Sequence, residues 1–419
     1  MAGPKTPQSL LVRVINRAGA PFKSRISLDP DDLMQRARAL THLDDFGEPG
    51  FEVALGVLVE SYLREARLNF MGRVLTQKSL LHCLTTRLQI EEYFRRNPQT
   101  ANVPVPDPII IAGAPRTGTT MLHGMLGADP ANRTLKVWEL FAPVPPGFTP
   151  CAPSDPRPEA VAQVMARYES RFMSAEGRRQ VNAAHMTRPN DPQECFPLLQ
   201  NSFASEVFGL FARADQYVRW LLEQDLTPAF RYHRRQIQLL TAAQPAARLV
   251  LKHPAHLSHL EEIFRVYPRA RVIQTHRDPA EVIGSMCSLC DTARGLHTDF
   301  VDRNHIGATV CDVLSISMER GMQARKKLDP DRFLDIHYRD LTANPMNALR
   351  TIYSWLGIPM TPELERTFAG YLDRDRQERA NHRHSYDLER YGLNAADVRS
   401  RYPEYIAQYL PDTSNRAGG

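Results

Sequence analysis

The sequence predicts an α/β fold in which a parallel sheet carries helices on both faces, preceded by an N-terminal helical extension. Two patterns predict this class. From about residue 105 onward, short apolar runs alternate with helical patterns, which is typical of a buried parallel sheet. Before residue 105, apolar residues recur only at helical spacing. We therefore expect a helical N-terminal region over residues 1–104 and an α/β domain over residues 105–419, with a helical insertion at about 143–245.

The N-terminal region contains three helical patterns. The first begins at Asp29 and Pro30, where an acidic cap residue precedes a proline at the first helical position. Apolar residues then follow at helical spacing: Leu33, Ala37 and Leu40 in the first pattern, Phe51, Leu55, Leu58, Val59 and Tyr62 in the second, and Leu80, Leu81, Leu84, Leu88 and Ile90 in the third. Four prolines between residues 97 and 108 predict a linker after the third helix.

Four apolar runs predict the strands of the sheet. They cover residues 109–112, 248–252, 271–276 and 332–337. The first run ends in glycine and proline, and a helical pattern opens at Thr119 soon after it. Between the first and second runs, seven prolines from residue 143 to 158 predict a surface loop, and residues 159–243 show a helical pattern rich in aromatic side chains.

Composition narrows the class of protein. A formal charge of +5 over 419 residues does not favour a nucleic-acid partner. No apolar run reaches the ~18 residues that a membrane span needs, and residues 1–9 open no signal-peptide pattern. Six sparse, irregularly spaced cysteines favour reduced thiols and a cytoplasmic protein. Cys287 and Cys290 have metal-like spacing without a second pair, so we interpret them as core residues of one helix face.

The first strand leads into a candidate anion-binding loop, Pro115-Arg116-Thr117-Gly118-Thr119-Thr120. A strand, a glycine turn and a helix N-terminus bring backbone N–H groups together, and the helix dipole adds positive potential. The hydroxyls can donate to phosphate oxygens, and Arg116 adds charge. This arrangement predicts a P-loop-like sheet. A nucleotide kinase would carry lysine where Thr119 stands, which disfavours that class of enzyme.

The loop resembles the 5′-phosphosulfate loop of sulfotransferases, which use 3′-phosphoadenosine 5′-phosphosulfate (PAPS). The family pattern is Pro-[Lys/Arg]-[Ser/Thr]-Gly-[Ser/Thr]-[Ser/Thr]. The resemblance implies that PAPS contacts Arg116, Thr117, Gly118, Thr119 and Thr120. It spans about residues 108–359, and the helical N-terminal region resembles a bacterial-type branch of the family.

A second motif resembles the family's 3′-phosphate site, where a serine follows an arginine by eight residues. Arg277 directly follows the third predicted strand, and Ser285 lies eight residues later on the helix that Asp278 and Pro279 begin. Both side chains can reach one anion at the carboxyl edge of the sheet. Tyr338, after the last strand, resembles a family tyrosine near the adenosine, although a core position suits it nearly as well.

One family feature is missing. Well-known cytosolic members close over the 3′-phosphate with Arg-Lys-Gly near the C-terminus, and this sequence lacks that triplet. Residues 382–386 offer an arginine and two imidazoles at the corresponding place, and a plain polar turn is the alternative.

Sulfuryl transfer requires in-line positioning, cations on the leaving phosphate and a base for the acceptor. Arg116 is suited to stabilise the leaving phosphate. Lys252 lies at the end of the second predicted strand and resembles a family lysine near the transferred group. Several branches place a glutamate base about as far after the loop as Glu139, which is therefore our first choice. His253 and His256 are the alternatives. His185, in the expected acceptor region, stays open as well.

The leading hypothesis is therefore a PAPS-dependent sulfotransferase acting on a hydroxyl or amine of a small, hydrophobic acceptor, with no metal. The alternatives are a P-loop nucleotide kinase or NTPase and a non-catalytic nucleotide-binding protein. The acceptor and the oligomeric state stay open at this point.

Overall fold

A computed structural model describes residues 7–149, 155–179, 188–242, 247–379 and 387–411. Its sheet has five strands in the order β2-β3-β1-β4-β5, and every neighbouring pair is parallel. The strands are β1 (Ile109–Gly113), β2 (Asn132–Thr134), β3 (Arg248–Lys252), β4 (Arg271–His276) and β5 (Phe333–His337). The predicted α/β class and parallel sheet are confirmed.

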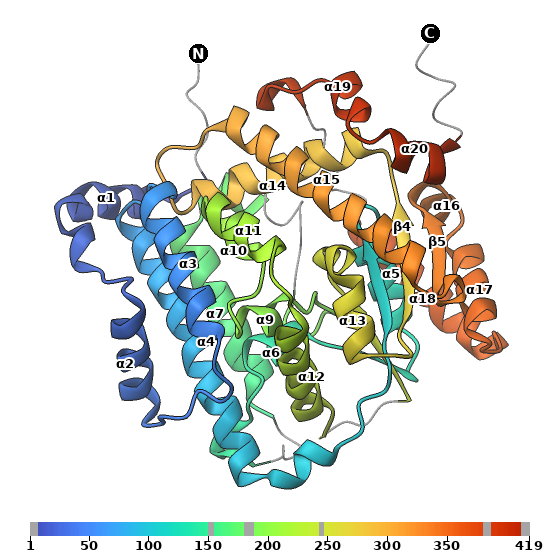
Figure 1. Ribbon diagram of the computed structural model, residues 1–419, viewed down its shortest axis with the longest axis horizontal. Helices are drawn as coiled ribbons and strands as arrows, with labels where there is room; N and C mark the ends of the chain where they lie inside the picture. Colours follow the sequence, from blue (N-terminus) through green and yellow to red (C-terminus); the bar gives the residue numbers. More distant parts are fainter. Residues whose placement is uncertain (1–6, 150–154, 180–187, 243–246, 380–386, 412–419) are drawn as a thin grey trace.

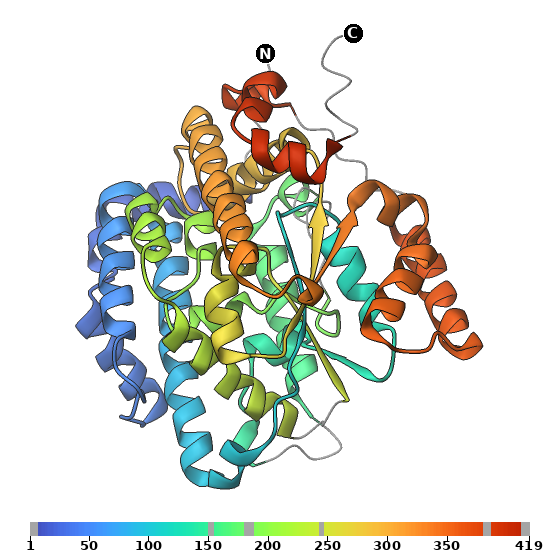
Figure 2. The same cartoon turned by 45° about the vertical axis from the view of Figure 1, so that its right-hand side comes forward.

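The centre of the sheet is buried, because the central strand β1 is apolar on both faces. Alternate residues of a strand point to opposite faces, so Ile110 and Ile109 enter different cores. Ile110 belongs to a large core shared with the N-terminal helices. Ile109 belongs to a smaller core with α5, α17 and α18. Figure 2 shows helices on both sides of the sheet, which explains why β1 is buried on both faces.

The helices before the sheet form a separate layer. They are α1 (Leu10–Gly19), α2 (Pro30–Thr41), α3 (Phe51–Glu65) and α4 (Phe70–Arg96). Figure 1 shows them on the side of the molecule opposite α17 and α18. Asp29 caps α2 by accepting from the N–H of Asp32, as the sequence predicts. The N-terminal helices share the large core, and the boundary at residue 104 stays a prediction.

The remaining helices surround the sheet. They are α5 (Thr119–Gly127), α6 (Val137–Phe141), α7 (Arg157–Phe172), α9 (Phe196–Gln200), α10 (Val207–Phe211), α11 (Asp215–Leu222), α12 (Thr227–Ala242), α13 (Leu260–Val266), α14 (Pro279–Gly295), α15 (Arg303–Lys327), α16 (Tyr338–Ala343), α17 (Pro345–Leu356), α18 (Pro362–Arg379), α19 (Ala395–Ser400) and α20 (Pro403–Tyr409). In the parts of the chain that the structure describes, no helix combines the length and apolar content that crossing a bilayer requires.

Two features depart from the sequence-based expectation. The edge strand β2 has the sequence Asn-Arg-Thr, too short and polar to be recognised as a strand, and it exists because it pairs with β3. The continuous helical pattern expected over residues 159–243 is divided among α7, α9, α10, α11 and α12, with loops between them. The described cysteines, Cys83, Cys195, Cys287, Cys290 and Cys311, are buried and free, which confirms the core interpretation of Cys287 and Cys290.

Candidate functional site

The carboxyl ends of three adjacent strands bring the two sequence motifs together. Parallel pairing sets Ile111 of β1 beside Lys252 of β3, and Gly113 of β1 beside Thr275 of β4. The loop after β1, the end of β3 and the start of α14 therefore share one edge of the sheet. Ligands of open α/β sheets bind at this edge.

The loop after β1 has the backbone of an anion-binding turn. Gly113, Arg116 and Gly118 have φ angles of 134°, 67° and 87°. Such left-handed positions turn successive N–H groups towards one point, and α5 begins directly after Gly118. The buried Thr117 hydroxyl donates to the carbonyl of Ala114 over 2.7 Å, which holds the turn.

The 3′-phosphate candidates contact this loop directly. Nε of Arg116 donates to the Ser285 hydroxyl over 2.9 Å, and Nη1 of Arg277 donates to the Arg116 carbonyl over 2.8 Å. The Arg277 guanidinium also stacks on Tyr338, 4.0 Å from the ring centroid, and pairs with Glu281. The sequence motifs, 161 residues apart at Arg116 and Arg277, form one cationic group.

Tyr338 closes over the glycine of the loop. A Cβ on Gly118 would lie 3.1 Å from the Tyr338 ring and 2.8 Å from Leu341. Only glycine fits between the loop and α16 at this φ. Tyr338 is half-buried and lies beside both the loop glycine and the Arg277 guanidinium.

A second group of polar side chains surrounds Lys252. Its Nζ donates to Oε1 of Glu194 over 2.6 Å and to the Thr120 hydroxyl over 3.2 Å. Nδ1 of His253 lies 3.2 Å from Oε2 of the same carboxylate. The lysine side chain is 1% exposed, whereas Glu194 is 19% exposed and Thr120 is exposed. The buried cation therefore reaches a solvent-accessible carboxylate and hydroxyl.

Glu194 is positioned by backbone hydrogen bonds on either side of it. The N–H of Gln193 donates to the carbonyl of Leu135, and the N–H of Cys195 donates to the carbonyl of Lys252. These contacts lie between β2 and α6 on one side and at the end of β3 on the other. Sequence reasoning missed Glu194 because it lies 58 residues before Lys252 and matches no motif.

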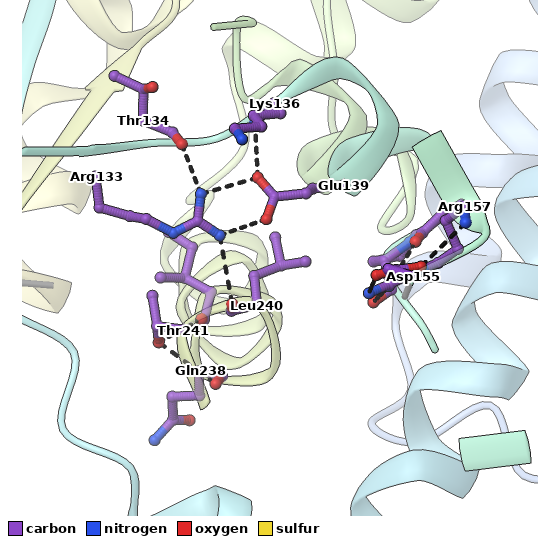
Figure 3. A network of polar contacts seen from close by, with 12 residues as sticks. Arg133, Thr134, Lys136, Glu139, Asp155, Arg157, Gln238, Leu240 and Thr241 are labelled. Atoms are coloured by element: carbon purple, nitrogen blue, oxygen red, sulfur yellow. Dashed lines mark hydrogen bonds and ion pairs between the residues drawn. The ribbon is translucent and has the colours of Figure 1, made fainter. Parts of the chain in front are cut away.

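Glu139 lies in a buried ion pair. Its two oxygens accept from the Arg133 guanidinium, and Oε2 also accepts from the N–H of Lys136 over 2.8 Å (Figure 3). Arg133 in turn donates to the Thr134 carbonyl over 2.7 Å. The side chain of Glu139 is 4% exposed, so the pair ties β2 to α6 inside the protein.

A buried histidine cluster lies next to the end of β3, where Lys252 is. Sγ of Cys195 and Nε2 of His256 are 3.0 Å apart, and Nδ1 of His233 is 3.0 Å from the Tyr267 hydroxyl. Burial raises the pKa of the Cys195 thiol and lowers the pKa of His233 to about 3, while burial and neighbouring histidines lower the pKa of His256.

This cluster has some features of a metal site. Ligand atoms of Cys195, His233 and His256 lie within 4.8 Å of one another. Two ligands on one tetrahedral zinc ion lie about 3.3–3.8 Å apart, farther than Sγ and Nε2 do here. The contact between Cys195 and His256 therefore has the geometry of a thiol hydrogen bond between neutral groups.

Two sequence candidates lie outside the described residues. They are His185 and the segment 382–386. The structure brings Arg116, Arg277, Ser285 and Tyr338 into one group, and Lys252, His253 and Thr120 into a neighbouring one, with Glu139 held by Arg133.

The chain is similar to known proteins across most of its length. A model of the sulfotransferase family matches residues 108–362. The crystal structure of sulfotransferase STF1 from Mycobacterium tuberculosis has 33% identity and a TM-score of 0.78, covering 89% of this chain and 98% of that chain. For STF9 from Mycobacterium avium, the identity is 27% and the TM-score 0.77, covering 91% and 96%.

A curated relative is named by its substrate. The omega-hydroxy-beta-dihydromenaquinone-9 sulfotransferase Stf3 of Mycobacterium bovis is 27% identical over 318 residues, which cover 72% of this chain and 74% of that protein. The family match includes both candidate anion-binding motifs and the whole sheet. This chain is a member of the sulfotransferase family.

Proposed function

We propose that this sulfotransferase takes its sulfuryl group from PAPS and transfers it to a hydroxyl on a hydrophobic acceptor. The observation that carries the proposal is the contact between the two anion-binding motifs. Arg116 donates to Ser285, and Arg277 donates to the Arg116 carbonyl. A donor with phosphate groups at both 5′ and 3′ positions matches two adjoining cationic loops, whereas ATP carries its phosphates in one chain.

The residues present fit such a donor. The loop N–H groups, Thr119 and Thr120 would hold the 5′-phosphosulfate at the start of α5. Arg277 and Ser285 would hold the 3′-phosphate, with Arg277 exchanging Glu281 for a ligand of higher charge. Tyr338 offers a half-buried ring beside both loops.

Lys252 is placed to stabilise the leaving phosphate, and Glu194 is placed to take the proton of the acceptor. As the acceptor oxygen bonds to sulfur, the bond from sulfur to the 5′-phosphate oxygen breaks and its electron pair stays on the departing phosphate. Lys252 and Arg116 would stabilise that charge. The acceptor proton would pass to Glu194, with Nδ1 of His253 orienting the carboxylate. Cationic side chains supply the charge stabilisation, so we propose a transfer that uses no metal.

In this proposal Glu139 has a structural role and does not take the proton. Its pair with Arg133 holds the segment from β2 to α6, and Leu135 of this segment accepts the hydrogen bond from Gln193. The alternative is that Glu139 is the base itself. The variants Glu194→Gln and Glu139→Gln distinguish the base from the structural residue.

Aromatic side chains beside Glu194 favour an apolar acceptor. The Phe196 ring lies 6.1 Å from the His253 ring and 6.5 Å from Phe141, centroid to centroid. Phe141 is 36% exposed and Phe196 is partly exposed, so both can contact a ligand. The Stf3 relative, whose name specifies a hydroxylated menaquinone, supports the same class of acceptor. The buried free thiols favour a reducing compartment such as the cytoplasm.

Calorimetry tests the donor. 3′-Phosphoadenosine 5′-phosphate (PAP) should bind with micromolar or tighter affinity, and ATP with magnesium should bind far more weakly. Equal affinities, or no PAP binding, would contradict the choice of PAPS.

Labelled PAPS with a series of linear alcohols tests the acceptor class. If the chain is buried, kcat/KM should rise about fourfold for each added methylene, because burying one contributes about 0.8 kcal/mol. A kcat/KM that does not change with chain length would contradict an apolar acceptor site.

A further inference from the structure

The first helix has an apolar face turned away from the protein. Leu10, Leu11 and Val14 of α1 are 69%, 57% and 58% exposed. Leu10 and Val14 are one turn apart, and Leu11 lies beside them, so the three form a single patch. Phe22, in the turn that follows α1, is 48% exposed. Other exposed apolar residues, such as Leu40 and Leu63, lie on separate helices.

The opposite face of α1 is anchored to the fold. The side chain of Asn16 accepts from the N–H of Met71 over 2.8 Å and donates to Gln8 over 3.1 Å. Gly19 lies so close to Phe70 that an added Cβ would overlap its ring. Ser9 caps the helix by accepting from the N–H of Val12. The helix is therefore fixed in one orientation, and burying its exposed face requires a partner outside the described chain.

The chain segment that carries this patch has charge of one sign. Residues 1–28 include five basic residues and no aspartate or glutamate: Lys5, Arg13, Arg17, Lys23 and Arg25. Arg13 and Arg17 are exposed and one turn apart on α1, beside the apolar patch. Lys23 and Arg25 are exposed in the turn that holds Phe22. A second copy of this chain would bring these cations together at a symmetric contact, where like charges repel.

The patch lies at the end of the molecule where the reaction is expected. Figure 2 shows β4 and β5 with their arrowheads towards the upper end, and in Figure 1 α1 lies at the upper end of the helical layer. Since the two views differ only by a turn about the vertical, α1 and the carboxyl edge of the sheet lie towards the same end.

We propose that α1 docks the enzyme on the surface of an anionic lipid bilayer. Leu10, Leu11, Val14 and Phe22 would enter the region between the headgroups and the acyl chains, and the surrounding cations would bind lipid phosphates. An exposed apolar helix face next to basic residues is typical of such interfacial helices. The proposal depends on the α1 surface alone, and lipid binding is measured without catalysis.

Vesicle flotation tests the proposal. The full chain should float with vesicles of phosphatidylglycerol and phosphatidylcholine, and much less with phosphatidylcholine alone. Binding should weaken in about 1 M NaCl, where charges are screened beyond ~3 Å. The double variant Leu11→Glu with Val14→Glu should reduce the partition coefficient at least roughly tenfold, because it removes two buried apolar side chains and adds repulsive charge.

Leu40→Glu with Leu63→Glu is the matched control. These residues are 66% and 54% exposed on α2 and α3, so the control adds the same charge on other helices and should float like the parent chain. Unchanged melting temperatures and PAP affinities would show that both variants fold.

Three results would overturn the proposal. The first is that the parent chain does not float with the vesicles, and the second is that the α1 variant floats as well as the parent. The third is that the parent chain forms a dimer and binds no vesicles, and that Leu11→Glu with Val14→Glu dissociates this dimer. The last would assign this face to a second copy of the chain.

Discussion

Nζ of Lys252 lies 2.6 Å from Oε1 of Glu194, although the two residues are 58 positions apart in the chain. The lysine is buried and the carboxylate is partly exposed, so the ion pair extends from the protein interior to the surface of the site. The Thr120 hydroxyl, 3.2 Å from the same Nζ, adds the loop that is expected to hold the donor. One ammonium group thus connects the proposed donor loop with the proposed base.

Glu194→Gln tests the base. If Glu194 accepts the acceptor proton, kcat should fall by roughly 10²–10⁴, while PAP affinity changes little. The acidic limb of the pH–rate profile should also disappear, because an amide does not titrate.

Lys252→Ala is the comparison for that variant. It should lower the rate but retain the acidic limb. A Glu194→Gln enzyme that keeps most of its turnover would mean that another group, Glu139 or His253, takes the proton.

Glu139→Gln should mainly reduce stability. Breaking a buried ion pair leaves the Arg133 charge without its partner and costs about 3–5 kcal/mol. Urea unfolding measures this loss. Arg133→Met with Glu139→Leu, which removes both charges, should recover much of it. A stable Glu139→Gln protein with turnover reduced as in the base test would instead identify Glu139 as the base.

Arg277→Ala should weaken PAP binding about 10- to 150-fold, because a charge-assisted contact contributes about 1.5–3 kcal/mol. Adenosine 5′-phosphosulfate lacks the 3′-phosphate, so its affinity should change little. Arg303→Ala, which removes a cation paired with Asp291 on α14, is the control. Equal loss of both ligands in Arg277→Ala would indicate that Arg277 mainly holds the Arg116 backbone.

His123→Leu should make stability less sensitive to acid. Burial, and next the charge of Lys252, lower the pKa of His123 to about 3 from 6.5. Between these two values the unfolded chain binds a proton that the folded chain does not, so His123 reduces stability as pH falls. The loss is about 1.4 kcal/mol per pH unit. The free energy of unfolding, measured with urea from pH 6.5 to 5, should fall less steeply in His123→Leu than in the parent chain. The two slopes should differ by about 1.4 kcal/mol per pH unit. Parallel slopes would contradict the lowered pKa.

Removal of divalent metals should leave turnover unchanged. The transfer is proposed to use Arg116 and Lys252 for charge stabilisation, and Cys195 and His256 stand at hydrogen-bond distance. Dialysis against EDTA followed by assay with labelled PAPS measures this. A loss of rate that zinc or magnesium restores would contradict the prediction.

The sequence by itself determined the features that depend on neighbouring residues. Strand β1, the turn through Gly118 and the start of α5 follow from one contiguous stretch, because apolar runs, positive φ and helix caps are local properties. The eight-residue step from Arg277 to Ser285 is local as well, since a strand end and two helical turns define it. These stretches identified the sulfotransferase family and predicted the loops that we propose hold the cofactor.

Only the tertiary structure decided which distant groups meet. Glu139 lies about as far after the anion-binding loop as the resemblance places a glutamate base. Its carboxylate nevertheless pairs with Arg133, and Glu194 contacts Lys252 instead. The exposed apolar face of α1 was likewise visible only in the tertiary structure. The helical pattern of α1 does not reveal which side packs on α4. The physical reason is that an ion pair or a buried face requires two segments to pack against each other, and residue spacing within one segment does not specify its partner.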